Sequence, residues 1–185
     1  MKPPALETRR LLLYPAHPRL AKAAADFYAR NRTFLQPFEP ALTEDFGTVA
    51  VQKQLMRRDR ALARADEGVR YWVFRKEEPH TAIGCVALNN IILGAFRSCF
   101  LAYKTDGQLL RQGYGAEAVA AVVELALHGM NLHRVEANIM PRNAASLALA
   151  RKCGFVEEGL ARKYLCINGV WEDHIHMVRL NEEME

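Results

Sequence analysis

The feature that most constrains the fold is the stretch from Leu110 to Gly115, which reads Leu-Arg-Gln-Gly-Tyr-Gly. It separates an apolar run that ends at Tyr103 from a helical run that starts at Ala116. Two glycines at the entrance of a helix allow the backbone to approach a ligand closely. The first-turn N–H groups of a helix lack intrahelical partners and carry the positive end of the helix dipole. The sequence therefore predicts a strand, a glycine turn and a helix that together form a seat for an anion.

Hydrophobic periodicity predicts a mixed α/β order around this turn. Period-two apolar runs bounded by turn residues predict strands at Leu6–Tyr14, Tyr71–Arg75, Thr81–Leu88, Arg97–Tyr103, Arg134–Ile139, Leu160–Ile167 and Trp171–Leu180. Apolar residues at helical spacing predict helices at Arg19–Asn31, Thr43–Ala65, Ala116–Met130 and Ala144–Cys153. We expect Asn143 to cap the last helix and Gly154 to end it. Asn168-Gly169 is expected to form the turn of a terminal hairpin.

Length and charge indicate one globular domain spanning residues 1–185, because a chain of this size buries a core without staples. The net charge of +4 comes from 25 basic and 21 acidic residues that are interleaved along the chain. This balance favours an anionic ligand, and direct nucleic-acid binding is not expected. The longest apolar run, Ala118 to Met130, is broken by Glu124 and His128, so no membrane span is expected.

The cysteines and histidines predict neither a disulfide framework nor a metal site. The four cysteines lack C-x-x-C spacing, and no leader-like apolar segment precedes them, so we expect reduced core thiols in a cytoplasmic protein: Cys85, Cys99, Cys153 and Cys166. A disulfide or zinc framework is the minor alternative. His174 and His176 share one face of a strand, but no third ligand follows at a suggestive spacing.

The spacing of the glycine turn and the Asn-capped helix resembles the GNAT acetyltransferase superfamily, in which Q/R-x-x-G-x-G/A opens a helix and binds a pyrophosphate. Asn-Ala-Ala-Ser-Leu-Ala-Leu-Ala-Arg-Lys-Cys-Gly-Phe from Asn143, and Asn-Gly-Val-Trp-Glu-Asp from Asn168, resemble the Rim-type ribosomal-protein N-terminal acetyltransferases. Asn-Arg-x-x-Leu-x-Pro-Phe-Glu-Pro from Asn31 resembles the RimJ-like branch, which acetylates N-terminal alanine. The chain departs from the motif at Leu110, its first position, and at Arg111, where relatives often carry glycine.

The resemblance implies an α/β (α+β mixed) GNAT fold. Its central sheet is mixed, largely antiparallel and twisted, with a splayed pair of strands and about four flanking helices. The resemblance also implies that acetyl-CoA is the co-substrate and that its pantetheine arm lies along the strand before the glycine turn. The residues expected to bind it are Leu101, Tyr103, Thr105, Arg111, Gln112, Gly113, Tyr114, Gly115, Ala116, Asn143 and Ser146.

Acetyl transfer to an amine needs a neutral nucleophile, a stabilised oxyanion and a proton for the departing thiolate. Ser146, three residues after the Asn143 cap, is the candidate proton donor, and a serine that only satisfies a backbone N–H is the alternative. Glu136 and Asn138 share one face of their strand, so a water between them is a candidate base. A salt-bridged Glu136 without a catalytic role is the rival reading.

The acceptor site is expected around the loop from Asn31 to Pro40. Within it, Phe38 and Glu39 are candidate contacts of the substrate, and Glu39 is a candidate partner for a positively charged protein N-terminus. A solvated loop acid is the alternative for Glu39. Tyr103 is expected to form a wall of the thioester site, and Trp171 to shape the groove or lock the hairpin.

These residues favour an acetyl-CoA-dependent enzyme that acetylates a protein N-terminal amine by direct transfer. The resemblance points to the N-terminal alanine of a ribosomal protein. Two alternatives stay open. In the first alternative, the enzyme acetylates a small amine such as a polyamine, an amino acid or an antibiotic. In the second, the chain is a CoA-binding ribosome-assembly factor with little catalysis.

Overall fold

A computed structural model describes residues 3–184, and one eight-stranded sheet runs through them in the order β1-β2-β3-β4-β5-β6-β8-β7. The strands are β1 (Leu6–Glu7), β2 (Leu11–Pro15), β3 (Val69–Arg75), β4 (Glu78–Ile92), β5 (Ser98–Thr105), β6 (Arg134–Ile139), β7 (Val156–Ile167) and β8 (Val170–Leu180). Neighbouring strands are antiparallel except for β5 and β6, which are parallel. The predicted mixed, largely antiparallel sheet is therefore confirmed.

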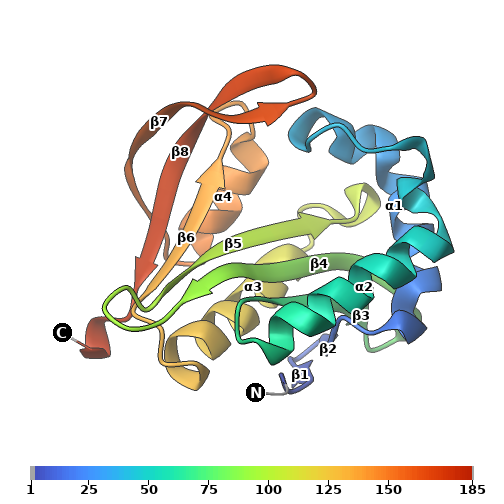
Figure 1. Cartoon of the computed structure of the whole chain (residues 1–185), viewed down its shortest axis with the longest axis horizontal. Coiled ribbons are helices and arrows are strands. Elements are labelled where there is room, and N and C mark those ends of the chain that lie inside the picture. Colours follow the sequence, from blue (N-terminus) through green and yellow to red (C-terminus); the bar gives the residue numbers. More distant parts are fainter. Residues whose placement is uncertain (1–2, 185) are drawn as a thin grey trace.

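Two layers of helices cover the sheet (Figure 1). The helices are α1 (Ala21–Leu35), α2 (Val49–Arg64), α3 (Tyr114–Glu124) and α4 (Ala144–Lys152). Helix α1 packs with α2 on one face over a core that contains Phe27, Trp72 and Phe74. Helices α3 and α4 pack on the other face, where Val119, Val122 and other apolar side chains of α3 join the larger core. The amphipathic faces predicted from the sequence are the faces that these helices bury.

Strands β5 and β6 separate along their length. They pair from Ser98 opposite Arg134 to Phe100 opposite Glu136. Beyond these residues β5 stays paired with β4 as far as Thr105, and β6 stays paired with β8 as far as Ile139. The two strands therefore form a wedge, which is the splayed pair that the resemblance implied (Figure 1).

The first helix is longer than predicted, so the expected loop from Asn31 to Pro40 is mostly helical. Helix α1 continues to Leu35, and a 3-10 turn follows at Gln36–Phe38. Asn31 does not end the helix, because its side chain is buried and its Nδ2 donates to the carbonyl of Phe27 one turn earlier (2.9 Å). Only the segment after Phe38 is an open loop.

Other predicted boundaries were also wrong. The predicted strands Thr81–Leu88 and Leu160–Ile167 are longer in the structure, where they form β4 and β7. The second helix begins at Val49 instead of Thr43, because the Thr48 hydroxyl accepts from Val51 N (3.3 Å) and caps it there, while Glu44–Gly47 forms a separate 3-10 turn. The predicted first strand is a small hairpin of β1 and β2. Helix α3 already includes Tyr114 and passes into a π-helical turn at Leu125–Gly129.

The prediction of four core thiols was right for three of them. Cys85, Cys99 and Cys153 are buried, whereas Cys166 is exposed near the tip of the β7–β8 hairpin, and all four are free. The Cys166 side chain is exposed because β7 is an edge strand whose residues are nearly all exposed. No helix within residues 3–184 is long and apolar enough to cross a membrane.

Candidate active site

The predicted anion seat is the N-terminus of α3, and its two glycines serve different purposes. Gly113 precedes the helix with φ of 81°, in the left-handed region that other residues adopt at a cost. Gly115 lies in the first turn, where a Cβ atom would be 2.8 Å from Thr105 Oγ1 and 2.9 Å from Leu149 Cδ1. Glycine therefore lets the start of α3 contact both the end of β5 and helix α4. Within residues 3–184 no side chain caps α3, so its first N–H groups are available to a ligand.

The turn between β1 and β2 braces this loop. Arg10 Nη1 donates to the carbonyl of Gln112 (3.0 Å), and its guanidinium lies 4.3 Å from the centroid of the Tyr114 ring. Glu117, in the first turn of α3, accepts from Arg10 N (2.8 Å), Arg10 Nε (2.7 Å) and Thr8 Oγ1 (2.6 Å). Burial acts to raise the pKa of Glu117, but these hydrogen bonds outweigh it and the pKa is lowered. The Arg111 side chain is exposed next to these contacts, and the Arg111 backbone has a φ of 60°.

The connection from β5 to the loop is tied to α1. Asp106, the residue after β5, accepts from Gln108 N (3.1 Å) and pairs with Arg30 Nε (2.7 Å). Asn31 Oδ1 accepts from Gly107 N (2.9 Å). These bonds hold the glycine loop against a helix more than 70 residues earlier in the chain.

The start of α4 lies across the wedge from β5. Asn143 caps this helix as predicted, because its Oδ1 accepts from Ser146 N (3.2 Å). The Ser146 hydroxyl donates to the Tyr103 hydroxyl (2.9 Å), which in turn donates to the carbonyl of Ser146 (2.9 Å). Burial raises the pKa of Tyr103 to about 12, although the bond to Ser146 acts to lower it. Tyr103 and Ser146 therefore form a protonated hydroxyl pair that links the two walls of the wedge at neutral pH.

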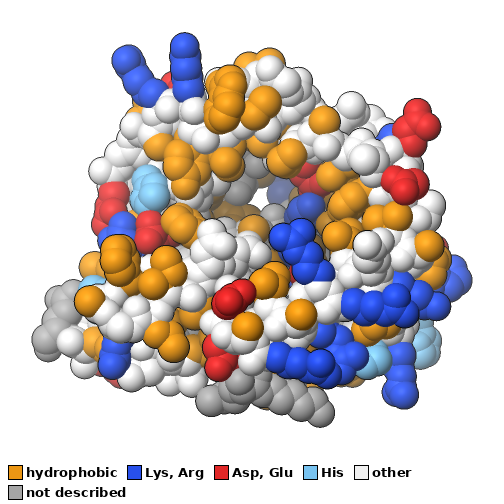
Figure 2. Space-filling model, viewed as in Figure 1, with side chains coloured by type: hydrophobic (Ala, Val, Ile, Leu, Met, Phe, Trp, Pro, Cys, Tyr) orange, Lys and Arg blue, Asp and Glu red, His pale blue; other side chains and the backbone are white. Residues whose placement is uncertain are grey.

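The free edge of β5 lies at the open end of this wedge. Leu101, Tyr103 and Thr105 follow the last residue that pairs with β6, so in the described chain their strand has no partner on that side. A strand edge offers unpaired N–H and C=O groups to an extended ligand. Figure 2 shows that this face of the molecule is hollowed at its centre, where Figure 1 shows β5 and β6 diverging.

The two β6 residues predicted as base differ in their surroundings. Both Glu136 oxygens are engaged, since Oε2 lies 2.5 Å from His176 Nε2 and Oε1 lies 3.2 Å from Arg134 Nε. Asn138 donates through Nδ2 to the Tyr164 hydroxyl (3.2 Å), while its buried Oδ1 has no hydrogen-bond partner within residues 3–184. The salt-bridged alternative therefore describes Glu136 as the structure has it, and Asn138 keeps a free acceptor.

The candidate substrate residues lie on both sides of the hollow. Glu39 is only 6% exposed and pairs with Lys104, so it is not a solvated loop acid. Phe38 is half-buried, and the Arg142 guanidinium lies 5.6 Å from its ring centroid. Trp171, 62% exposed at the start of β8, does not lock the hairpin by burial.

Several residues that shape the site were not identified from the sequence. Arg10, Glu117, Asp106 and Lys104 each have a partner 65 or more positions away, as in the pair of Arg10 with Glu117. A single sequence has no local signal for such pairs. Asn31 is the exception, because a buried amide inside an alanine-rich helix is costly without partners and so points to a distant hydrogen bond.

Comparison with known proteins decides the family. A family model described as an acetyltransferase (GNAT) domain matches residues 10–156. This chain belongs to the GNAT acetyltransferase family. It is an N-acetyltransferase, and GNAT acetyltransferases use acetyl-CoA. Within residues 3–184 no group of three or more His, Cys, Asp or Glu residues could hold a metal ion.

Relatives of this GNAT enzyme include ribosomal-protein acetyltransferases. It is 34% identical over 180 residues to the probable N-acetyltransferase YjcK of Bacillus subtilis (strain 168), covering 97% of this chain and 99% of the relative. It is 32% identical over 170 residues to the [ribosomal protein uS5]-alanine N-acetyltransferase of Escherichia coli (strain K12), covering 92% and 87%. The crystal structure of the ribosomal-protein-S5-alanine acetyltransferase from Vibrio fischeri superposes with a TM-score of 0.92 at 31% identity, covering 99% and 100%.

Proposed function

We propose that this GNAT enzyme transfers the acetyl group of acetyl-CoA to a protein N-terminal amine, with the N-terminal alanine of a ribosomal protein as the favoured acceptor. The position of Ser146 carries the proposal. Its hydroxyl lies in the first turn of α4, at the open end of the wedge and beside the free edge of β5. The similarity to the uS5-alanine enzyme supports the acceptor class.

The residues around the wedge fit acetyl-CoA. Its pyrophosphate binds the N–H groups of residues 111–116, because an uncapped helix N-terminus attracts an anion. Gly113 supplies the left-handed φ that precedes the helix, and Gly115 lets the start of α3 pack against Thr105 and Leu149. Arg111 is exposed and adds a cation to this seat. The pantetheine arm extends along Leu101, Tyr103 and Thr105 as an added strand, and the side chain of Asn143 contacts it beside the cap.

The reaction is a direct transfer. The nitrogen of the neutral amine attacks the thioester carbon, a C–N bond forms, and the C–S bond breaks. The N-terminal dipole of α4 stabilises the negative charge that develops on the departing sulfur, and Ser146 gives its proton to that sulfur as the thiol forms. The proton that the amine loses returns through water to restore the Ser146 hydroxyl. Tyr103 holds the Ser146 hydroxyl in place and forms a wall of the thioester site.

The acceptor enters from the opposite face of the sheet. Glu39 binds its ammonium form, and the free Oδ1 of Asn138 orients the amine or a water that removes the surplus proton. Glu136 shares this strand face with Asn138, and its two oxygens pair with Arg134 and His176. Phe38 and Trp171 contact the peptide that follows the amine.

Thermal unfolding in the presence of CoA tests the cofactor site. CoA at about 100 times its Kd is expected to stabilise the folded state by about 2.7 kcal/mol. For a domain of this size that corresponds to a rise in Tm of about 5–10 °C. A Tm that does not change with CoA, at concentrations that shift the Tm of a known GNAT enzyme, would contradict the assignment of residues 111–116.

A further inference from the structure

Lys104 is a half-buried cation next to the proposed reaction site, and the transfer chemistry leaves it without a role. It follows Tyr103 on β5, and successive side chains of a strand point to opposite faces. The Tyr103 side chain reaches Ser146 on the α4 face, so the Lys104 side chain extends to the α1 face. One strand therefore separates the proposed proton donor from Lys104.

The Lys104 ammonium contacts one group within α1 and one in the segment that follows it. Its Nζ lies 2.5 Å from Glu39 Oε1, and it donates to the Tyr28 hydroxyl at 3.2 Å. The same ammonium lies 5.0 Å from the centroid of the Tyr28 ring. The Lys104 and Glu39 side chains are 23% and 8% exposed, so water screens this ion pair weakly.

The surroundings of Lys104 favour its charged form and the neutral form of Tyr28. Burial acts to lower the pKa of Lys104, but its interactions with Tyr28, Cys85 and Glu39 outweigh burial and the pKa is raised. Burial raises the pKa of Tyr28 to about 12. At neutral pH Lys104 is therefore charged and Tyr28 is neutral, and Glu39 is the carboxyl group in contact with the Lys104 ammonium.

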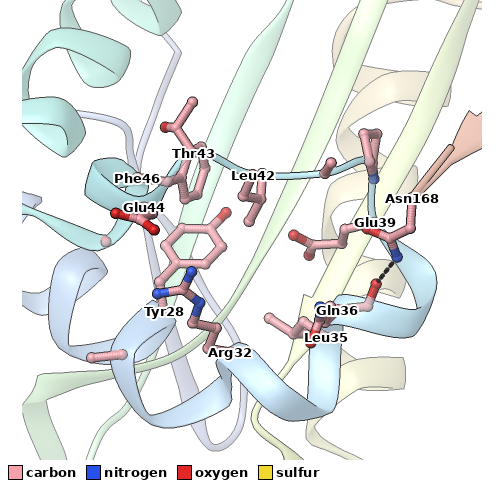
Figure 3. A pocket seen from close by; sticks show the side chains of 14 residues that line it. Tyr28, Arg32, Leu35, Gln36, Glu39, Leu42, Thr43, Glu44, Phe46 and Asn168 are labelled. Carbon is pink, nitrogen blue, oxygen red and sulfur yellow. Dashed lines mark hydrogen bonds between the residues drawn. The ribbon is translucent and has the colours of Figure 1, made fainter.

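The Glu39 carboxylate is one of the groups that line a cavity of about 370 Å³. Oε2 is buried and has no hydrogen-bond partner within residues 3–184. In Figure 3 the Glu39 carboxylate points between Tyr28 and Leu42, into the space that the segment after Phe38 covers. A buried carboxylate oxygen without a donor is costly unless a ligand supplies one.

The walls of the cavity favour an organic cation. The rings of Tyr28 and Phe46 meet edge to face at 4.8 Å, and both line the cavity. Aromatic faces and a carboxylate together bind ammonium groups. Two other charged side chains, Arg32 and Glu44, line the same cavity, and their charges offset each other. The β7–β8 turn closes one side, where Asn168 Nδ2 donates to the carbonyl of Gln36 (2.7 Å).

We propose that Lys104 is a positioning residue that holds the Glu39 carboxylate through Oε1, so that Oε2 accepts a hydrogen bond from the ammonium of the acceptor in this cavity. The inference rests on the proposed function, because it names the site where the acceptor amine waits before it loses a proton. The alternative hypothesis is that the Lys104–Glu39 ion pair is only structural and holds the loop after α1 against β5.

Steady-state kinetics with a peptide that starts with alanine tests Lys104. Lys104→Met is expected to raise the KM for the peptide about tenfold or more at pH 7 and to leave the KM for acetyl-CoA within twofold. A buried carboxylate without its partner favours the protonated form. As the pH is lowered, the peptide KM is therefore expected to start rising at a higher pH in Lys104→Met than in the parent. Lys104→Arg is expected to keep the pH dependence of KM that the parent shows. Lys53→Met, at an exposed lysine of α2, is the matched control and leaves both KM values unchanged.

A double-mutant cycle completes the test. If Lys104 acts through Glu39, adding Lys104→Met to Glu39→Gln raises the peptide KM no further than Glu39→Gln alone. Two results would overturn the positioning role: effects of the two substitutions on peptide KM that add fully, or a Lys104→Met enzyme with a lower Tm but the parent's pH dependence of KM. Either result would mean that the Lys104–Glu39 ion pair is only structural. Lys104→Gln replaces Lys104→Met should the latter not fold. A parent enzyme that does not acetylate the peptide refutes the proposed function itself, a result that the Lys104 variants cannot produce.

Discussion

Replacing Ser146 by alanine separates its structural role from its proposed chemical one. In the folded protein the substitution removes the hydrogen bond to the Tyr103 hydroxyl. The Asn143 cap remains, because it bonds the backbone N–H of residue 146, and Tyr103 still donates to the carbonyl of residue 146. The loss in the free energy of unfolding is therefore that of one hydrogen bond, about 0.5–1.5 kcal/mol. The higher helix propensity of alanine offsets part of this loss.

The expected effect on catalysis is larger. General acid catalysis by a positioned side chain contributes about 10²–10⁴-fold to a rate. We expect Ser146→Ala to lower kcat about 10²–10³-fold, which is about 3–4 kcal/mol of transition-state stabilisation. The KM for acetyl-CoA is expected to stay within about threefold, because the proposed contacts of pyrophosphate and pantetheine are mainly with backbone groups elsewhere.

A continuous assay of thiol release, with melting curves for each variant, measures both effects. Tyr103→Phe is the comparison variant, since it keeps the Ser146 hydroxyl and removes the two hydrogen bonds that the Tyr103 hydroxyl makes with residue 146, only one of which involves the Ser146 hydroxyl. We expect it to lower kcat about tenfold or less, within the value of one hydrogen bond. A kcat for Ser146→Ala within threefold of the parent would refute Ser146 as the donor. A larger loss in Tyr103→Phe than in Ser146→Ala would assign the proton to Tyr103 instead.

Three further substitutions test the frame around the wedge. Gly113→Ala forces a positive φ on alanine, so it should lower the free energy of unfolding by about 1–2 kcal/mol. It should also weaken CoA binding measured by calorimetry. An unchanged affinity would contradict the proposed pyrophosphate site. Asn143→Ala removes the α4 cap and should lower Tm by the equivalent of about 1 kcal/mol; no change in Tm means that the cap is not stabilising. Bonds from Gln108 N–H and Arg30 lower the pKa of Asp106 although burial acts to raise it. The ionised Asp106 carboxylate therefore stabilises the fold above its unfolded-state pKa, and this stabilisation is lost as pH falls through its folded-state pKa. In Asp106→Asn the free energy of unfolding, measured by chemical denaturation, should fall less steeply with pH below about pH 4 than in the parent. A pH dependence parallel to the parent's opposes this prediction.

The sequence predicted the parts of the fold whose causes are local. The glycine turn, the Asn143 cap and the Asn168-Gly169 hairpin each follow from one or two residues with a special backbone role, and each lies where predicted. Helix α1 was predicted too short, because the partners that let Asn31 stay inside a helix include Gly107, which is 76 positions away.

The site could be predicted in outline and not in its electrostatics. Spacing placed Ser146 three residues after its cap and placed Glu136 and Asn138 on one strand face, as the structure has them. It did not reveal that both Glu136 oxygens contact neighbouring side chains or that Lys104 pairs with Glu39. Such charge pairing depends on strand order and helix packing, which no local pattern encodes.

Intact-mass and fragment-ion spectrometry of an alanine-starting peptide, after incubation with the enzyme and acetyl-CoA, tests the central claim most directly. The account predicts one acetyl group per peptide, located on the N-terminal amine, and none on a peptide whose N-terminus is already blocked. It also predicts that Gly113→Ala lowers the yield. An unmodified peptide, in a reaction where the same enzyme preparation acetylates a polyamine or a free amino acid, would contradict the claim.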